Sequence, residues 1–192
     1  MFHCKEDIRA ERSAAMLYDA LMEELKAKPL DKVTVSDLSK RSTVSRATFY
    51  RNFDEIIDLL YWKCDSAFHE VLTAFSDSEP DLTKEDVLIE FLLRYWMEPE
   101  HIHLMETIMD AGRLDIIYNS FVDNAEIILN FMKTHGISMS TDNYAFFISV
   151  RAGFFVGIIR AWIQTGKKQT PEELSEIVRE QHDDVIKSGL LI

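Results

Sequence analysis

Residues 33–53 read V-T-V-S-D-L-S-K-R-S-T-V-S-R-A-T-F-Y-R-N-F, and this stretch predicts two short helices joined by a tight turn. Thr34 is a suitable N-cap for the first helix, and Asp37, three residues later, can complete a capping box. The expected turn is Ser42-Thr43-Val44. Ser45 is then a suitable N-cap for the second helix.

The second of these helices has two contrasting faces. Phe49 and Phe53 are four residues apart, so they share a face that can pack on Leu38 and Val44. The opposite face carries two cations, a small hydroxyl, a phenol and an amide, from Arg46, Thr48, Tyr50, Arg51 and Asn52. A short polar helix held to its neighbour by two aromatic rings has the properties needed to enter a DNA major groove.

The stretch 34–53 resembles the helix-turn-helix of TetR/AcrR-type transcriptional regulators, and V-S-R-A-T-F-Y-R-x-F is its most specific part. The direct resemblance covers about the first third of the chain, and the rest agrees in layout. It implies an all-α fold of about nine helices. A three-helix DNA-binding head would come first, followed by a helical body for ligand binding and dimerisation.

The resemblance also implies which residues contact double-stranded DNA. Arg46, Thr48 and Tyr50 are expected at bases and phosphates, and the remaining expected contacts, mainly phosphate clamps, are Ser36, Lys40, Ser45, Ala47 and Arg51. We therefore expect a homodimeric repressor that binds a palindromic operator with half-sites about one helical turn (~34–36 Å) apart. A small-molecule effector of unknown identity would release it, as in the family.

The charge distribution is compatible with this expectation. The 192-residue chain has a formal net charge of -12, but residues 1–63 hold 11 basic and 11 acidic side chains. All of the acidic excess lies in residues 64–192, and within 31–53 five basic residues face two acidic ones. The motif is thus a locally basic patch on an acidic chain, which would help to orient docking on DNA.

Hydrophobic periodicity and punctuation predict the domain organisation. We expect a DNA-binding domain at 6–53, a connecting helix at 54–76 and a regulatory and dimerisation domain at 77–192. The further helical segments, separated mainly by Pro and Gly, are expected at 6–27, 83–97, 100–111, 113–134, 141–165 and 170–188.

The middle of the chain is rich in aromatic and methionine side chains, which usually form core but can also line a ligand cavity. Arg151 shares a helical face with apolar residues such as Phe147 and Phe155. Two interpretations of Arg151 remain open: a structural ion pair with Glu106, Asp110 or Asp115, or a counter-ion for an anionic effector. The candidate effector-binding residues are Tyr95, Trp96, Met105, Met109, Tyr118, Arg151 and Phe154.

Small residues predict the dimer interface. Gly153 and Gly157 lie away from the Arg151 face and allow close helix approach. We expect the last two helices to form a four-helix interface with a second copy, as the resemblance also implies.

Other classes of function lack sequence support. The chain has no glycine-rich phosphate loop, no G-x-S-x-G and no H-E-x-x-H, so we expect neither an enzyme nor a cofactor. His101 and His103 are two apart and cannot chelate a metal from one helix face. The apolar stretch 144–163 contains Arg151 and Arg160, which argues against a membrane span. Cys4 and Cys64 are expected as free thiols in a cytoplasmic protein.

One alternative stays open, a helical protein-interaction module that kept the fold but binds DNA weakly or not at all. Two departures from the family pattern motivate it. Residues 54–58 read D-E-I-I-D where the family commonly has a phosphate-binding lysine, and Thr43 stands where a glycine is usual.

Overall fold

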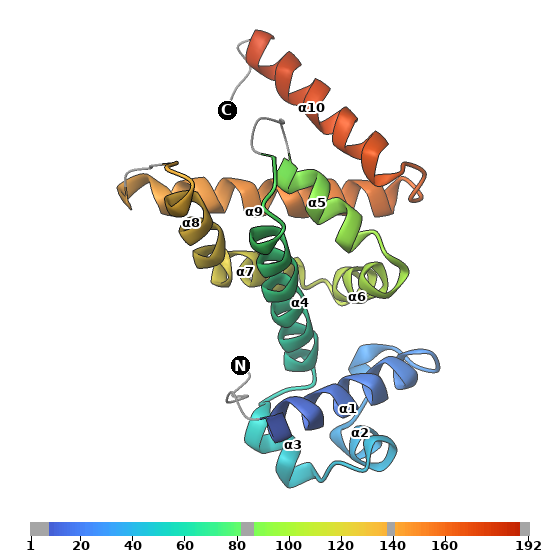
Figure 1. Ribbon diagram of the computed structural model, residues 1–192. Helices are drawn as coiled ribbons and strands as arrows, with labels where there is room; N and C mark the ends of the chain where they lie inside the picture. Colours follow the sequence, from blue (N-terminus) through green and yellow to red (C-terminus); the bar gives the residue numbers. More distant parts are fainter. Residues whose placement is uncertain (1–7, 82–86, 138–140, 189–192) are drawn as a thin grey trace. The chain divides into compact units, whose positions relative to one another are not determined.

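The computed structural model describes residues 8–81, 87–137 and 141–188, and the regular elements in these ranges are ten α-helices and one 3-10 turn (Figure 1). The all-α prediction is confirmed. The elements are α1 (Ile8–Leu25), η1 (Leu30–Lys32), α2 (Val35–Ser42), α3 (Arg46–Asn52), α4 (Ile57–Asp77), α5 (Val87–Trp96), α6 (Pro99–Asp110), α7 (Leu114–Asp123), α8 (Ala125–Thr134), α9 (Thr141–Gln164) and α10 (Pro171–Ser188).

The structure divides one helix that the sequence predicts as continuous. The expected helix at 113–134 is broken at Asn124, which separates α7 from α8. The Asn124 amide donates from Nδ2 to the Ser120 carbonyl at 2.9 Å, and its Oδ1 lies 3.2 Å from Nδ1 of His69 on α4. Asn competes with the helix for backbone hydrogen bonds, and here a side chain from another helix holds it in place.

The chain forms two compact units that divide within α4. We call residues 1–66 the head unit and residues 67–192 the body unit. In the head unit α1 packs against both α2 and α3. Its core contains residues from all four helices, with no more than 3% of any side chain exposed: Ala14, Leu17, Ala20, Leu21, Leu38, Phe49, Phe53, Leu59, Leu60 and Cys64. Phe49, Phe53 and Leu38 are therefore buried as predicted.

A cluster of aromatic rings fills the core of the body unit. Phe68 on α4 lies 4.6 Å from Trp96, 5.6 Å from Phe121 and 5.6 Å from Phe155, measured between ring centroids. The four rings come from α4, α5, α7 and α9, so one cluster joins four helices. Edge-to-face and tilted aromatic pairs of this kind stabilise a core beyond the area that they bury.

The turn between α2 and α3 contains a strained residue. Thr43 has φ 62° and ψ 4°, a left-handed conformation, at the C-cap of α2. This conformation disfavours a β-branched side chain, and glycine adopts it readily. The helix-turn-helix geometry is thus reached in spite of Thr43.

We predict that Thr43→Gly stabilises the head. Relief of the left-handed strain, less the entropy lost by a glycine, should raise the free energy of unfolding by roughly 0.5–1 kcal/mol. The matched control is Ala47→Gly in α3, where an exposed helical position should lose about 1 kcal/mol. Denaturant unfolding followed by circular dichroism measures both. A Thr43→Gly variant that is as destabilised as Ala47→Gly would contradict the assigned turn conformation.

Candidate nucleic-acid interface

The N-terminus of α2 is fixed by a complete capping box. The Thr34 hydroxyl accepts from the Asp37 backbone N–H at 3.2 Å, and the Asp37 carboxylate accepts from the Thr34 backbone N–H at 3.0 Å. The prediction of this box is confirmed. Two predicted contact residues, Ser36 and Lys40, follow on α2, and both side chains are exposed. They are four residues apart, so they lie on the same helix face.

The helix α3 is capped by Ser45, as predicted. The Ser45 hydroxyl accepts from the Thr48 backbone N–H at 3.1 Å and also lies 2.9 Å from the Thr48 hydroxyl. Within α3, Phe49 points into the core, and the Tyr50 ring meets its edge at 87° with centroids 5.3 Å apart. The Tyr50 side chain remains 54% exposed, so its phenol can reach a partner outside the head.

The structure brings the eight predicted DNA contacts together on α2, α3 and the residue that caps α3. Seven of them are exposed, namely Ser36, Lys40, Ser45, Arg46, Ala47, Tyr50 and Arg51. Thr48 is half-buried, and its hydroxyl lies 2.9 Å from that of Ser45. One expectation was wrong: Asn52 belongs to the polar face in sequence, but only 5% of its side chain is exposed.

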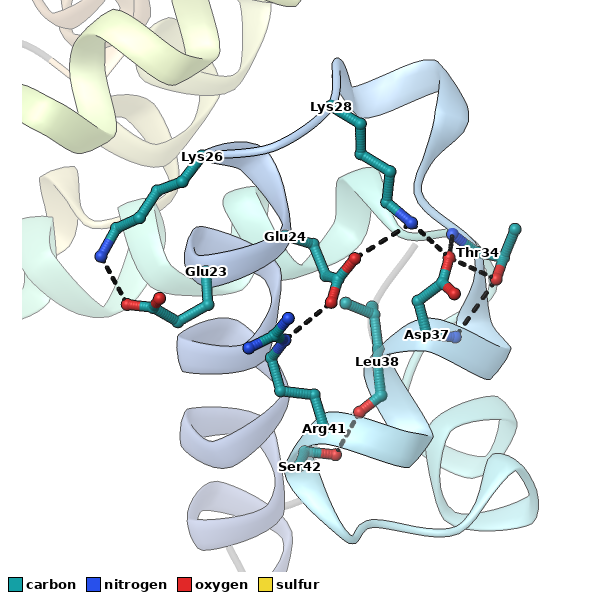
Figure 2. A network of polar contacts seen from close by, with 9 residues as sticks. All are labelled: Glu23, Glu24, Lys26, Lys28, Thr34, Asp37, Leu38, Arg41 and Ser42. Carbon is teal, nitrogen blue, oxygen red and sulfur yellow. Dashed lines mark hydrogen bonds and ion pairs between the residues drawn. The ribbon is translucent and has the colours of Figure 1, made fainter.

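An ion-pair network that the sequence did not predict connects α1 to α2 (Figure 2). Glu24 accepts from Arg41 Nε at 2.7 Å through Oε1 and pairs with Lys28 Nζ at 3.0 Å through Oε2. Lys28 Nζ also donates to Asp37 Oδ2 at 2.6 Å, and Asp37 is the capping-box residue of α2. The network therefore contacts α2 near both of its ends.

The same contacts shift the pKa values of the charged groups in the network. The hydrogen bond from Lys28, and then those from Thr34, lower the pKa of Asp37 from 3.8 to about 2. Hydrogen bonds from Lys28 and Arg41 also lower the pKa of Glu24, and those to Asp37 and Glu24 raise the pKa of Lys28. Both carboxylates are consequently ionised, and the network intact, at neutral pH.

The acidic run at 54–58 is in part structural. Asp58 is 8% exposed, and its Oδ2 accepts from the backbone N–H groups of Asp54 at 3.0 Å and Glu55 at 2.9 Å. These two bonds order the segment between α3 and α4. Asp54 and Glu55 expose their side chains, so two of the three carboxylates remain at the surface.

In the body unit, one face of α9 is both apolar and exposed. The exposed fractions are 75% for Phe146, 66% for Val150 and 49% for Phe154. Gly153 and Gly157 lie on the same stripe, and a Cβ added at either would meet no atom within 4 Å. Large apolar side chains gathered on one helix face mark an interaction surface. We call these five residues the α9 stripe.

The helix α9 is also, over residues 143–164, long and apolar enough to cross a membrane by length and composition. Its other face is part of the body core, where Ile148, Ala152, Phe155 and Ile159 are each at most 3% exposed. Of the apolar window in this helix, 28% is buried inside the structure.

Arg151 is not part of a buried ion pair. Its side chain is exposed, its guanidinium lies 3.5 Å from the Phe147 ring centroid, and its Nη1 donates to the Phe147 carbonyl at 3.4 Å. Of the expected partners, Glu106 pairs with Lys167, and Asp115 pairs with Arg113 at 2.8 Å. Of the two interpretations that the sequence left open, a structural ion pair with Glu106 or Asp115 is therefore not supported by the described contacts.

The remaining candidate effector residues differ widely in exposure. Trp96 and Met105 are fully buried, Tyr95, Met109 and Tyr118 are half-buried, and Phe154 belongs to the α9 stripe. Trp96 is packed in the aromatic cluster. A shallow depression of about 230 Å³ contains only Met109 of the seven and is otherwise lined by His103, Glu106, Thr107, Asp110 and Ile163. Its lining is about equally polar and apolar.

Comparisons with known proteins agree with these features. Residues 17–60 match the family described as bacterial regulatory proteins, tetR family, and residues 100–181 match the family described as transcriptional regulator C-terminal region. Among solved structures, Lin0861 from Listeria innocua is similar at 20% identity and a TM-score of 0.77, over 94% of both chains. The fatty acid degradation regulator FadR from Bacillus halodurans has 14% identity and a TM-score of 0.48, over 93% of this chain and 95% of that one. No curated protein matches in sequence.

Proposed function

Because the chain belongs to the TetR family of transcriptional regulators, we propose that it is a cytoplasmic repressor that binds a palindromic operator as a homodimer. The observation that carries the proposal is the exposed face of α2 and α3. It combines Ser36, Lys40, Arg46, Tyr50 and Arg51 on two capped helices, with Phe49 directed into the core behind it. Cations and hydroxyls at a helix surface suit both phosphates and base edges.

In this proposal α3 is the recognition helix. Its N-terminal residue Arg46 and its phenol-bearing Tyr50 are four apart and share one face. Ser36 and Lys40 on α2 would contact the backbone beside the groove. Two heads of a symmetric dimer would then read half-sites about one helical turn, ~34–36 Å, apart.

We predict that Arg46→Ala and Tyr50→Phe each weaken binding to a DNA duplex that the wild-type protein selects from a random-sequence pool. Loss of one phosphate contact should lower the slope of log K against log salt by about one, and loss of a base contact should cost about 1–3 kcal/mol. Tyr50→Phe keeps the ring contact with Phe49 and removes only the hydroxyl. Fluorescence anisotropy over a salt series measures both effects.

The control for these variants is Arg179→Ala on α10, which removes an exposed arginine from the body unit. It should bind as the wild type does. Unchanged binding by both head variants at matched salt would contradict the assigned interface. If the wild type selects no duplex at all, the alternative of a protein-interaction module without autonomous DNA binding is favoured instead.

We further propose that the α9 stripe is covered by a second copy of the chain. Its residues follow i, i+4, i+7, i+8 and i+11, which places them on one helix face. Gly153 and Gly157 leave open space above the backbone, which allows a partner helix to approach closely. Ile177 on α10, the next helix in the chain, is also 37% exposed, so the proposed interface of the last two helices can include it.

We predict that Gly157→Leu disrupts the dimer. Within one chain the new side chain meets only open space, and leucine favours a helix more than glycine by about 1 kcal/mol, so the monomer itself should not be destabilised. Loss of assembly would therefore report a clash with a partner. Analytical ultracentrifugation of this variant and of Ala74→Leu, an exposed alanine on α4, makes the comparison. An intact dimer in both variants would place the interface elsewhere.

A small-molecule effector that binds the body unit completes the proposed mechanism, and Arg151 is the candidate counter-ion for an anionic compound. Two observations support this role: the guanidinium is exposed, and its nearest described contacts are the ring and carbonyl of Phe147. An exposed cation held by a cation–π contact keeps donors directed to solvent.

We predict that Arg151→Met leaves the melting temperature without ligand nearly unchanged, because the substitution strands no carboxylate. Any thermal shift that a panel of small organic acids causes in the wild type should be lost in this variant. Arg160→Met, an exposed arginine on the same helix, is the control and should retain the shift. A shift that persists in Arg151→Met would assign the counter-ion role to another residue.

A further inference from the structure

We propose that Glu24 is a positioning residue for DNA binding, because it holds Arg41 and, through Lys28 and Asp37, fixes α2 on α1. The inference rests on the proposed DNA-binding function and adds a residue that touches no DNA. Figure 2 shows Glu24 between Arg41 and Lys28, with one carboxylate oxygen directed to each. Glu24 is the most buried member of the network, with 13% of its side chain exposed.

The placement of the contacts explains why the network positions α2 rather than only stabilising it. Arg41 lies in the last turn of α2, and Asp37 lies in its first turn. Glu24 reaches the first directly at 2.7 Å and the second through Lys28, whose ammonium lies 3.0 Å from Glu24 and 2.6 Å from Asp37. Contacts near both ends of this eight-residue helix prevent it from rotating about its own axis. They thereby fix the direction in which Ser36 and Lys40 point.

The network also bears on whether Arg41 can contact a DNA phosphate. Arg41 lies next to the predicted phosphate clamp Lys40 and is itself exposed, so its position in sequence suggests a phosphate contact. Its Nε, however, donates to Glu24. We therefore assign Arg41 to the α1–α2 junction, and we expect it to contribute no phosphate contact of its own.

Loss of the network should affect the stability of the head and its binding to DNA differently. Although Glu24 is largely buried, Lys28, Asp37 and Arg41 are each at least 27% exposed. Ion pairs with solvent-exposed partners contribute little to the free energy of unfolding, so the head should remain folded without the network. The contact face, in contrast, needs α2 and α3 in one arrangement, and α2 packs directly on α3. A small rotation of α2 would displace both of its contacts from the DNA backbone.

Two variants with the same change of charge test the proposal. Glu24→Gln removes the acceptor of the network, and Glu23→Gln removes the neighbouring carboxylate, which is hydrogen-bonded to Lys26 at 2.6 Å and interacts with Arg41 only through a weaker electrostatic attraction. Simple electrostatics predicts that both variants bind the selected duplex slightly more tightly, because each loses a negative charge near phosphates. The positioning role predicts that Glu24→Gln alone binds more weakly, by about tenfold, which equals about 1.4 kcal/mol.

The salt dependence and a double-mutant cycle complete the experiment. The salt slope of Glu24→Gln should equal that of the wild type, since no phosphate contact is lost. Arg41→Met should weaken binding to the same extent with an unchanged slope, and the double variant should be no weaker than either single variant. Circular dichroism must show native helicity for each variant at the assay temperature, and Arg41→Met serves as the second test if Glu24→Gln unfolds.

Each result has a defined meaning. Equal or tighter binding by Glu24→Gln relative to Glu23→Gln overturns the positioning role. A salt slope lowered by about one in Arg41→Met, with additive losses in the double variant, identifies Arg41 as a phosphate contact and also overturns it. If the wild type selects no duplex, the proposed function itself fails, and the inference fails with it.

Discussion

The proposed DNA-contact surface depends on the burial of one side chain, Phe49. The helix α3 has seven residues, whereas isolated helices shorter than about 12–15 residues are marginal in water. Burial of a phenylalanine provides about 1.5–3 kcal/mol, and Phe49 is fully buried with Phe53 beside it at 5.7 Å between centroids. The Ser45 cap adds to this at the N-terminus. Because the helix is held from behind in this way, its outer face can carry polar side chains.

The sequence correctly predicts contacts between residues that are close together in the chain. The Thr34–Asp37 box and the Ser45 cap join groups three residues apart, and the helical period places Phe49 and Phe53 inward. The contacts that it did not predict join residues that are far apart in the chain. Glu24 and Arg41 are 17 apart and His69 and Asn124 are 55 apart, and these pairings depend on how helices cross. A helical wheel also describes one helix without its neighbours, which is why Asn52 was wrongly placed on the exposed face and the surroundings of Arg151 were left open.

The numbers of acidic and basic residues in the head do not show which charged side chains are paired and which are exposed. Glu24 and Asp37 are occupied by Lys28 and Arg41, and Asp58 is occupied by backbone N–H groups. The predicted contact residues contain three cations and no acid. The surface of α2 and α3 is thus more positive than the balance of 11 basic and 11 acidic residues in 1–63 indicates. An acidic chain can in this way present a local positive potential to DNA without a net positive charge.

The α9 stripe has a consequence for how this protein behaves at different abundances. If association covers Phe146, Val150 and Phe154, the folded state is favoured by mass action, and the melting temperature rises with the logarithm of protein concentration. Dilution would have the opposite effect, since a lone chain would leave these side chains in water and become more accessible to proteases. Its steady-state level in a cell would then fall more steeply than its rate of synthesis whenever synthesis is reduced. A surface built from three side chains and two glycines would thereby set a threshold of expression below which the regulator does not accumulate.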